Sequence, residues 1–484
     1  MINDVTYRRP EYVAALDRWR LVRDACKGSD AIKAGKTLYL PQPNPDDKSA
    51  ANTERYKDYI KRAVFFNATG RTKNGLVGAV FRTVPTFTAP ASLAYLTEDA
   101  DGAGVSIYQQ SQMVLADVLE TGRSFLLVDF PDVVKTDGSS DSSVKDLQEG
   151  GVQATIKAYP AEAVINWRTT KVGAKHLLSL VVLVETHEVE GDFEVETWPQ
   201  YRVLRLVYGS YLVEVWRQDE KGGDFGLKEQ YIPTRGNGQN WNEIPGGFVG
   251  SQNNDTSPDD APLYDMAEVN VGHYRNSADY EDSVYMVGQP QIYMAGLDQT
   301  WVDMLEGKGI YFGSRAPLML PQGGTAGILQ VEPNSMAKEA MDGKEVQMVA
   351  LGARLVEQGS ATKTATQAGA DNAAEHSVLS LVASNVSEVY TKALQFAADF
   401  MGVTGKCEYA LNQDFVEASV DPQVISELLK AVQAGQLPAS DFWTEMRRIG
   451  LIKAEKTDEE IRDELETSST GLALDMNDDN DRAA

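Results

Sequence analysis

The stretch of sequence that decides the fold is residues 262–287, which read PLYDMAEVNVGHYRNSADYEDSVYMV. Apolar and small residues recur there at the spacing of one helical face, at Leu263, Met266, Val269 and Ala278. Asp259 or Asp260 can cap this helix, Pro262 fits its first turn, and Pro290 stops it. The pattern therefore predicts one long helix.

A small β module and a second long helix follow. The Gly- and Pro-punctuated sequence indicates short strands at Gln291–Met294, Gly309–Phe312 and Ile328–Val331. Asn334 or Ser335 then opens a helix that reaches Gln358, with Gly343 and Gly352 as interruptions. The order helix, β module, helix is the centre of the predicted fold.

Beyond this centre lies Gly359–Asn372, mainly Ser, Thr, Ala and Gly with one cation, Lys363. A long helix follows, stopped by Gly402, with an apolar stripe at Val378, Val382, Val386, Val389, Ala393, Phe396, Ala397 and Phe400. Further elements are expected in chain order: a strand at Glu408–Leu411 and helices at Pro422–Ala434, Ser440–Ile449 and Thr457–Leu465. The end of the chain, rich in Asp, is expected to be a solvated acidic tail.

The chain before residue 260 reads as helices followed by strands. Helices are predicted at 10–28, from Asn52 onwards and at 106–119, with Gly70, Gly75 and Gly78 loosening the path after the second. Strands are predicted at Phe125–Val128, Ala154–Tyr159, Leu178–Val189, Phe193–Trp198, Val203–Tyr208 and Tyr211–Trp216. We expect Asp132–Gly151 to be an exposed insertion and 236–258 a loop. The fold class is therefore α+β with an antiparallel sheet.

The charge is high and uneven. The 484 residues include 45 Lys and Arg against 71 Asp and Glu, a formal net charge of −26. Residues 1–82 hold 16 basic and nine acidic side chains, so the remainder is strongly acidic. Proteins that grip duplex DNA show the opposite balance. The bulk surface is therefore not expected to hold nucleic acid tightly.

Signals for catalysis are weak. Gly35-Lys36-Thr37 resembles the end of a phosphate loop, but Asp30 stands where that motif needs its first glycine. The four histidines are dispersed, and two cysteines cannot make a four-ligand zinc site. Asp99 and Asp101 fit a turn better than a metal site. The sequence predicts no enzyme, no cofactor and no metal centre.

Particular strings, in this order, resemble the portal proteins of tailed bacteriophages. These strings are Tyr59-Ile60-Lys61-Arg62-Ala63, Thr69-Gly70-Arg71-Thr72, Gly75 to Arg82, Leu119-Glu120-Thr121-Gly122 with Phe125 to Asp129, Tyr159-Pro160 with Ile165-Asn166-Trp167, and Pro262-Leu263-Tyr264-Asp265 with Asn270 and His273-Tyr274. The resemblance spans about residues 50 to 465.

The resemblance implies a portal-like division of the chain. Its parts are a wing at 1–260, a first stem helix at 261–287, a clip at 288–333, a second stem helix at 334–358, a tunnel loop at 359–372, the long wing-crown helix with its returning wing strand at 373–420, a helical crown at 421–470 and a disordered acidic tail at 471–484. It also implies a ring of about twelve copies at one capsid vertex of a virion, assembled in the host bacterial cytoplasm. Its implied partners are the terminase large subunit, a head-completion adaptor, the major capsid or scaffold protein and passing double-stranded DNA, with no membrane.

Two groups of residues carry the implied contacts. Thr362, Lys363, Thr364 and Thr366 are expected to face DNA in the tunnel, while a plain link without DNA contact is the alternative. Asp298, Trp301, Asp303 and Glu306 are expected to dock the terminase or adaptor, while Trp301 could instead fill the core of the clip itself. An enzyme acting on phage or cell polymers and a non-ring scaffold remain the alternative functions.

Overall fold

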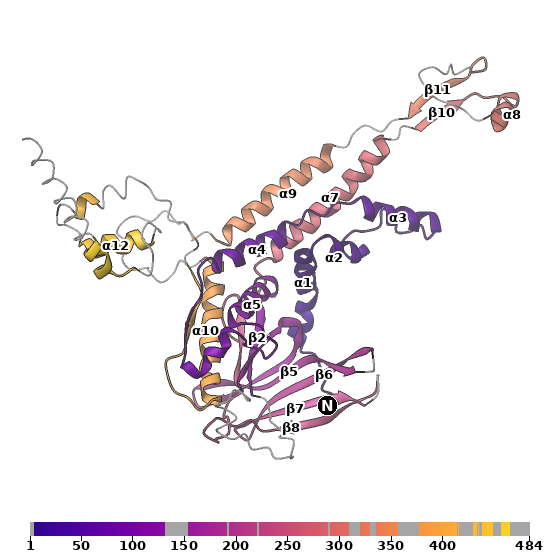
Figure 1. Cartoon of the computed structure of the whole chain (residues 1–484). Coiled ribbons are helices and arrows are strands. Elements are labelled where there is room, and N and C mark those ends of the chain that lie inside the picture. Colours follow the sequence, from indigo (N-terminus) through magenta and orange to yellow (C-terminus); the bar gives the residue numbers. More distant parts are fainter. Residues whose placement is uncertain are drawn as a thin grey trace, which may run out of the picture. The chain divides into compact units, whose positions relative to one another are not determined.

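The computed structural model (Figure 1) describes residues 4–130, 153–190, 193–219, 222–288, 291–308, 320–329, 335–356 and 377–413, then 415, 429–432, 434, 438–448 and 456–464. The chain divides into two units, Met1–Gln413 and Asp414–Ala484. The described elements mix helices and antiparallel strands, which confirms the α+β class.

Short helices open the first unit. They are α1 (Pro10–Lys27), α2 (Ser29–Ala34), the 3-10 turn η1 (Lys36–Leu38), α3 (Ala50–Arg62) and α4 (Ala68–Val80). The prediction that glycines loosen the chain after α3 was wrong, because Asn67 caps α4 by accepting the N–H of Gly70 at 2.9 Å. A Cβ on Gly70 would lie 2.5 Å from the carbonyl oxygen of Cys26. That glycine lets α4 approach α1 closely.

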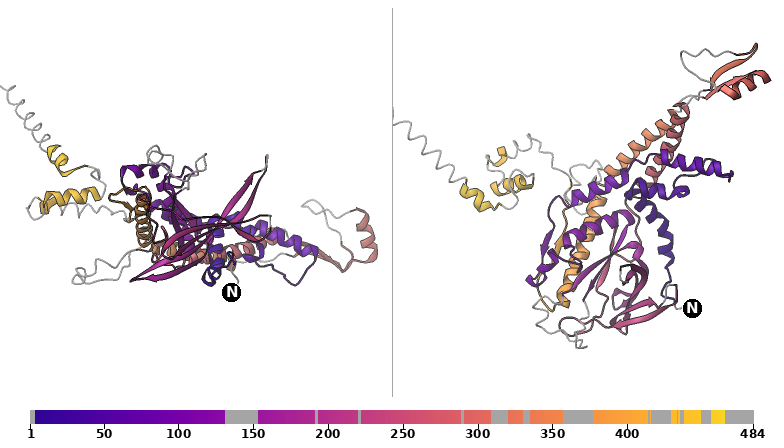
Figure 2. Two further views of the ribbon diagram at one scale, coloured as in Figure 1. Left: turned by 90° about the horizontal axis from the view of Figure 1, so that it is seen from below. Right: turned by 45° about the vertical axis from the view of Figure 1, so that its right-hand side comes forward.

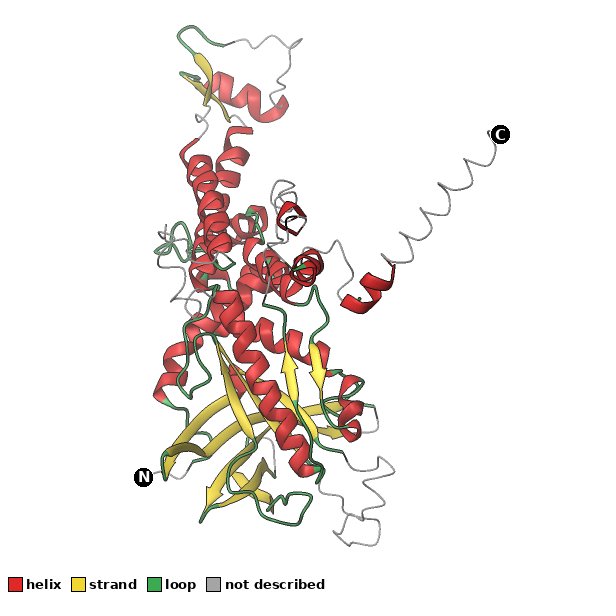
Figure 3. Cartoon of the chain, turned by 90° about the vertical axis from the view of Figure 1, so that its left-hand side faces the viewer, coloured by secondary structure: helices red, strands yellow, loops and turns green. Residues whose placement is uncertain are grey.

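A fully buried strand forms the centre of the unit. Helix α5 (Ile107–Thr121) begins with a capping box of Ser106 and Gln109 and ends at Gly122, whose φ is 73°. Strand β2 (Arg123–Asp129) follows, between β3 (Thr155–Pro160) and β9 (Gly246–Gly250), both antiparallel to it. Helices α5 and α10 (Val378–Phe400) contact this three-stranded sheet, and Figure 3 shows helices in red lying over strands in yellow.

A five-stranded antiparallel meander packs beside this centre. Its strands in spatial order are β4 (Val164–Val172), β5 (Lys175–Glu190), β6 (Val195–Val207), β7 (Ser210–Gln218) and β8 (Phe225–Tyr231). The two strands predicted at 193–198 and 203–208 are one strand, β6, because β5 pairs with it continuously past Pro199. Strands β4, β8 and β9 were not predicted.

The central prediction of two helices around a β module matches the chain order. Helices α7 (Tyr264–Gly288) and α9 (Ser335–Arg354) run side by side (Figures 1 and 2). Between them lie β10 (Gln291–Ala295), α8 (Gln299–Lys308) and β11 (Thr325–Leu329), and β10 pairs antiparallel with β11. Strand β11 begins three residues before the predicted Ile328, helix α8 was not predicted, and 309–312 lie outside the described residues.

The last strand of the first unit pairs with its first strand. Strand β12 (Glu408–Ala410) pairs with β1 (Thr86–Thr88), and two further 3-10 turns are η2 (Ala91–Thr97) and η3 (Ala161–Ala163). Neither Gly343 nor Gly352 interrupts α9, which ends at Arg354 rather than at Gln358.

The second unit is described in part. Helix α12 (Ala439–Arg448) matches the prediction of 440–449, and a short helix occupies 458–464. Met446 and Ile461 are buried, and Arg447 forms an ion pair with Asp458. The unit boundary falls at 413/414, whereas the sequence placed the crown from 421. The predicted insertion at 132–151 and the acidic tail lie outside the described residues.

Candidate functional site

Helix α7 is anchored to the N-terminal helices by buried polar contacts. Asn270 is fully buried and accepts from the backbone N–H of Thr69 at 3.1 Å and from its hydroxyl at 2.9 Å. Nearer the other end of α7, the Tyr59 hydroxyl donates to Asp279 at 2.6 Å, and burial together with that carboxylate raises the pKa of Tyr59. Both halves of α7 are therefore anchored to the N-terminal helices α3 and α4.

Helix α9 packs on α7 through a mixed interface. Ala337 and Met348 of α9 are buried, and Lys344 donates to Asn276 at 3.1 Å. Nε2 of the buried His273 lies 3.3 Å from Glu345, but the geometry is not that of a hydrogen bond. This interface covers only one side of α9.

The outer side of α9 exposes large apolar side chains. Met336, Val346 and Val349 are 76%, 71% and 73% exposed. At the end of α7, Val284, Tyr285 and Met286 are about half exposed as well. Exposed apolar side chains that lie together are typical of interaction surfaces, so these positions on α7 and α9 are candidates for one.

The two-stranded sheet of β10 and β11 is similarly incomplete. Ile292, Tyr293 and Ile328 are exposed, and among the described residues β10 and β11 pair only with each other. A lone two-stranded ribbon is marginally stable in water. Within the described residues, the pair therefore leaves both of its sheet edges unpaired and apolar side chains exposed.

The structure places the predicted docking residues around α8. Asp298 caps this helix by accepting the N–H of Trp301 at 3.0 Å, and Gln299 donates to Asp303 at 2.9 Å. Asp298 and Asp303 are exposed and Trp301 is half-buried, while Glu306 lies in α8 with a side chain outside the described atoms. Docking by these residues stays a prediction, and Asp298 also has a structural role that the sequence did not reveal.

The predicted tunnel residues Thr362, Lys363, Thr364 and Thr366 lie outside the described part of the chain. Described residues on either side of these positions are joined by a backbone hydrogen bond. The N–H of Leu379 in α10 donates to the carbonyl of Leu355, just after α9, at 3.1 Å. The chain between them thus leaves and returns at one place.

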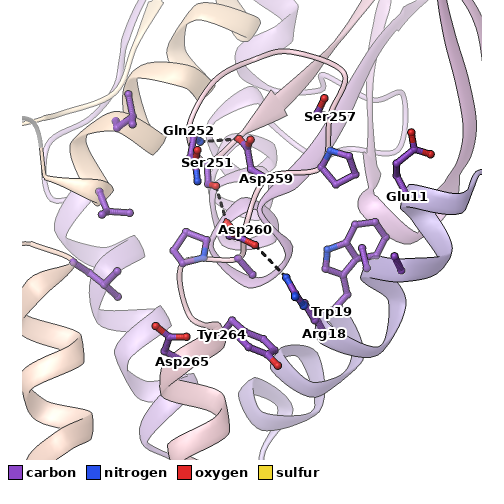
Figure 4. Close-up of a pocket in the computed structure, with 18 residues that line it drawn as sticks. Glu11, Arg18, Trp19, Ser251, Gln252, Ser257, Asp259, Asp260, Tyr264 and Asp265 are labelled. Atoms are coloured by element: carbon purple, nitrogen blue, oxygen red, sulfur yellow. Dashed lines mark hydrogen bonds and ion pairs between the residues drawn. The ribbon is translucent and has the colours of Figure 1, made fainter.

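A groove of about 850 Å³ lies between α1, the loop before α7, and the first turn of α10 (Figure 4). Four carboxylates line it, those of Glu11, Asp259, Asp260 and Asp265, and Arg18 is the cation that lines it within the described residues. Arg18 pairs with Asp260 at 3.2 Å, and Asp259 accepts the N–H of Gln252 at 2.7 Å. The other wall is apolar and includes Leu355, Val378 and Leu381. We call this feature the acidic groove.

A buried arginine, Arg123, packs between aromatic rings. Arg123 is 1% exposed and lies between the rings of Trp167 and Phe248, at 3.9 and 3.8 Å from their centroids. Burial lowers the pKa of Arg123 to about 9. Burial likewise raises the pKa of the Cys26 thiol to about 12, which makes it a poor nucleophile at neutral pH.

Two further features bear on chemistry. Across the described residues, no group of three or more His, Cys, Asp or Glu side chains is arranged to hold a metal ion. None of the helices in the described part of the chain combines the length and apolarity that a bilayer crossing requires.

Comparisons with known proteins bear on the same region. The family described as a domain of unknown function, DUF4055, matches residues 262–401, from the start of α7 to the end of α10. No curated protein matches the chain. Among solved structures, a chain of the virion of a native gene transfer agent particle is similar at 13% identity and a TM-score of 0.39, covering 81% of this chain and 91% of that one.

Two related structures match to the same extent. A chain from the neck of the empty gene transfer agent particle, computed with C6 symmetry, has 13% identity and a TM-score of 0.40 over 79% of this chain and 90% of that one. A chain from the neck of the native particle, computed with C12 symmetry, has 13% identity and a TM-score of 0.40 over 79% of this chain and 89% of that one.

Proposed function

We propose that this chain is the subunit of a portal, a ring of about twelve copies at one vertex of a phage-like capsid. The observation that carries the proposal is the α7–α9 helix pair, between which the chain forms the β10–β11 sheet, with apolar side chains exposed on both parts. Such a surface is stable in water once neighbouring subunits cover it. A head-to-tail contact repeated around an axis closes into a ring.

The module formed by β10, α8 and β11 is the docking site in this proposal. Its exposed Asp298 and Asp303 and its half-buried Trp301 offer charge around an aromatic anchor, which is the composition of an interface centre and rim. The terminase would dock there during packaging and a head-completion adaptor afterwards. The body of the unit would contact the capsid or scaffold protein.

The channel role rests on charge and on chain length. A subunit with a net charge of −26 repels the DNA backbone, so a ring of such subunits guides DNA without holding it. The backbones of Leu355 and Leu379 are joined by a hydrogen bond, so a turn of a few residues would be enough to connect α9 to α10. The chain between these two residues is far longer than that. The extra length supports a loop that projects into the channel with Lys363 as its cation.

The other candidate functions have less support. A scaffold should be mostly helical, whereas a five-stranded meander and a three-stranded sheet form much of the first unit. A polymer-acting enzyme should place His, Asp or Glu together on loops, and the acidic groove is the nearest such cluster, with its Asp259 and Asp260 carboxylates already bonded.

The test of the proposal is the mass of the assembled protein. Purified full-length chain at micromolar concentration and moderate salt is measured by mass photometry and imaged by negative-stain microscopy. We expect a single closed ring near twelve times 53.0 kDa. A stable, fully folded monomer under these conditions would overturn the proposal.

A further inference from the structure

The acidic groove is a charged, partly apolar site with spare binding capacity. Its four carboxylates exceed its one guanidinium by three charges. Asp265 has no hydrogen-bond or ion-pair partner among the described residues, and Val378 on the apolar wall is 40% exposed. Figure 4 shows Asp265, Asp260 and Glu11 spread around the groove rather than gathered on one point. That spacing suits an extended cationic surface better than a single ion.

A surface of the opposite character lies on the same chain. Residues 27–62, which we call the basic lobe, hold eight Lys and Arg against five Asp and Glu, and Asp282 of α7 pairs with Arg55 and Arg62, so the lobe keeps a net charge of +2 with that carboxylate included. The Lys36 side chain is exposed and has no partner among the described residues, and Lys36 adopts a left-handed φ of 45°. Beside it, Leu38 is 50% exposed. The lobe thus presents a cation next to an apolar side chain, as the groove presents carboxylates next to an apolar wall.

The two surfaces lie at opposite ends of α1. The groove uses the first half of that helix, up to Trp19, whereas the lobe begins at Lys27 and continues into α2 and α3 (Figure 1). At 1.5 Å per residue, the nine residues from Arg18 to Lys27 separate them by about 14 Å along the helix. Because one straight helix holds the acidic groove and the basic lobe apart, the two surfaces can contact each other only between two copies of the chain.

We propose that the acidic groove of each subunit receives the basic lobe of a second copy of this chain. This contact is heterologous, with a different patch on each side, so its repetition generates a ring. The inference rests on the proposed ring and specifies which surfaces join its subunits. It also gives a function to the basic N-terminal region, which the sequence alone left without one.

A charge exchange between the two surfaces tests the contact. The groove variant carries Asp260→Lys and Asp265→Lys, and the lobe variant carries Lys36→Glu and Lys57→Glu. Each variant reverses the sign of one patch, so in each the patches repel. We expect each purified variant to require at least tenfold more protein to assemble than the wild type. An equimolar mixture of the two should form rings again, since every groove then meets a lobe of opposite sign in an alternating ring.

Matched controls separate this contact from misfolding and from the ring itself. Asp17→Lys changes an exposed acid of α1 outside the groove, and Lys171→Glu changes an exposed base of β4. Both should assemble like the wild type, and all variants should keep wild-type circular dichroism. Rings from either patch variant alone, or no rings from the mixture of folded variants, would overturn the inference and leave the ring intact. Failure of the wild type to assemble would instead overturn the proposed function.

Discussion

One arginine joins three parts of the body of the molecule. Arg23 of α1 lies 2.6 Å from Asp117 and 2.5 Å from Glu120, both in α5, and 2.9 Å from Glu162 in η3. Although burial alone would lower the pKa of Arg23, the three carboxylates raise it above its ordinary value. The guanidinium is therefore the main counter-charge of this cluster, and Lys73 of α4, 2.8 Å from Glu120, is the second.

Removing this guanidinium should destabilise the first unit strongly. Arg23→Ala leaves three carboxylates near one another with Lys73 as their remaining cation, and because the cluster is partly buried we expect a loss of about 3 kcal/mol, the lower end of the cost of breaking a buried ion pair. Thermal unfolding followed by circular dichroism measures the loss. The control is Arg20→Ala, which removes the 3.7 Å pair with Asp24 from an arginine that is 61% exposed. Surface pairs are worth up to about 1 kcal/mol, so equal losses in the two variants would contradict the role of Arg23.

Arg123 should behave in the opposite way. None of its side-chain nitrogens has a hydrogen-bond partner in the described structure, and burial costs it enough to lower its pKa to about 9. A shift of that size corresponds to on the order of 5 kcal/mol, against roughly 2 kcal/mol for each of its two desolvated cation–π contacts, so the charge brings no net gain. Arg123→Met keeps the packing between Trp167 and Phe248 without the charge. We expect its unfolding temperature to equal or exceed that of the wild type, and a clear fall would show that the cation is needed.

Among the helices, α9 has the exposed apolar face best suited to a test of assembly. Val346→Glu together with Val349→Glu adds charge where both side chains are over 70% exposed, so the isolated subunit should fold as before. Covering these charges in an interface is costly, and assembly measured by mass photometry should fall at least tenfold. The control is Val172→Glu on β4, a valine that is 52% exposed on another surface. Normal rings from the double variant would exclude this face from the contact.

The module formed by β10, α8 and β11 allows a docking test that leaves the N-terminal cap of α8 intact. Asp303→Lys reverses an exposed charge that, within the described residues, accepts a hydrogen bond from Gln299 on the same helix. We expect weaker terminase or adaptor binding, by about tenfold in dissociation constant, with rings intact. Asp298→Lys is a poor probe, because it also removes the cap of α8. Unchanged binding of Asp303→Lys rings in a pull-down would remove this carboxylate from the docking site.

What the sequence revealed depended on how strongly each element is patterned. Helices α5 and α10 were predicted nearly to the residue, since Ser106, Gly122 and an unbroken apolar stripe mark them locally. Strand β9 was missed because it is rich in glycine, and the reason for Gly246 is tertiary. A Cβ there would lie 2.6 Å from the carbonyl of Leu126 on the neighbouring strand. Helix α8 was missed although Asp298 and Trp301 carry a capping pattern, because the surrounding glycines and prolines indicated strands.

The candidate surfaces were predictable to a lesser degree. Composition showed that the first 82 residues are basic and the rest acidic, but nothing local indicated that Glu11 and Asp265 line one groove. That groove arises from the packing of α1, α7 and α10, whose contributions are more than 100 residues apart in the chain. The segment 359–372 was recognised by its small polar residues alone. The Leu355–Leu379 hydrogen bond shows that a much shorter chain would be enough to connect α9 to α10.

For the whole molecule, the decisive question is whether the segment between α9 and α10 handles DNA. In the proposed ring of about twelve acidic copies, one Lys363 per subunit would supply a circle of separated cations to the channel. Such a circle contacts phosphate weakly and exchanges quickly, whereas a continuous basic groove would hold the duplex. Lys363→Glu should therefore impair passage without affecting assembly, because the bonded ends at Leu355 and Leu379 do not involve it.

Heads assembled with this variant provide the measurement. Packaged genome length and DNA retention are compared among wild type, Lys363→Glu and a deletion of Thr362 to Thr366, with rings confirmed in each case by microscopy. Lys363→Arg serves as the charge-conserving control and should package normally. We expect shorter packaged genomes or lost retention in the Glu and deletion variants. Normal packaging and retention in both would show that the segment is a plain link and that the acidic wall alone guides the DNA.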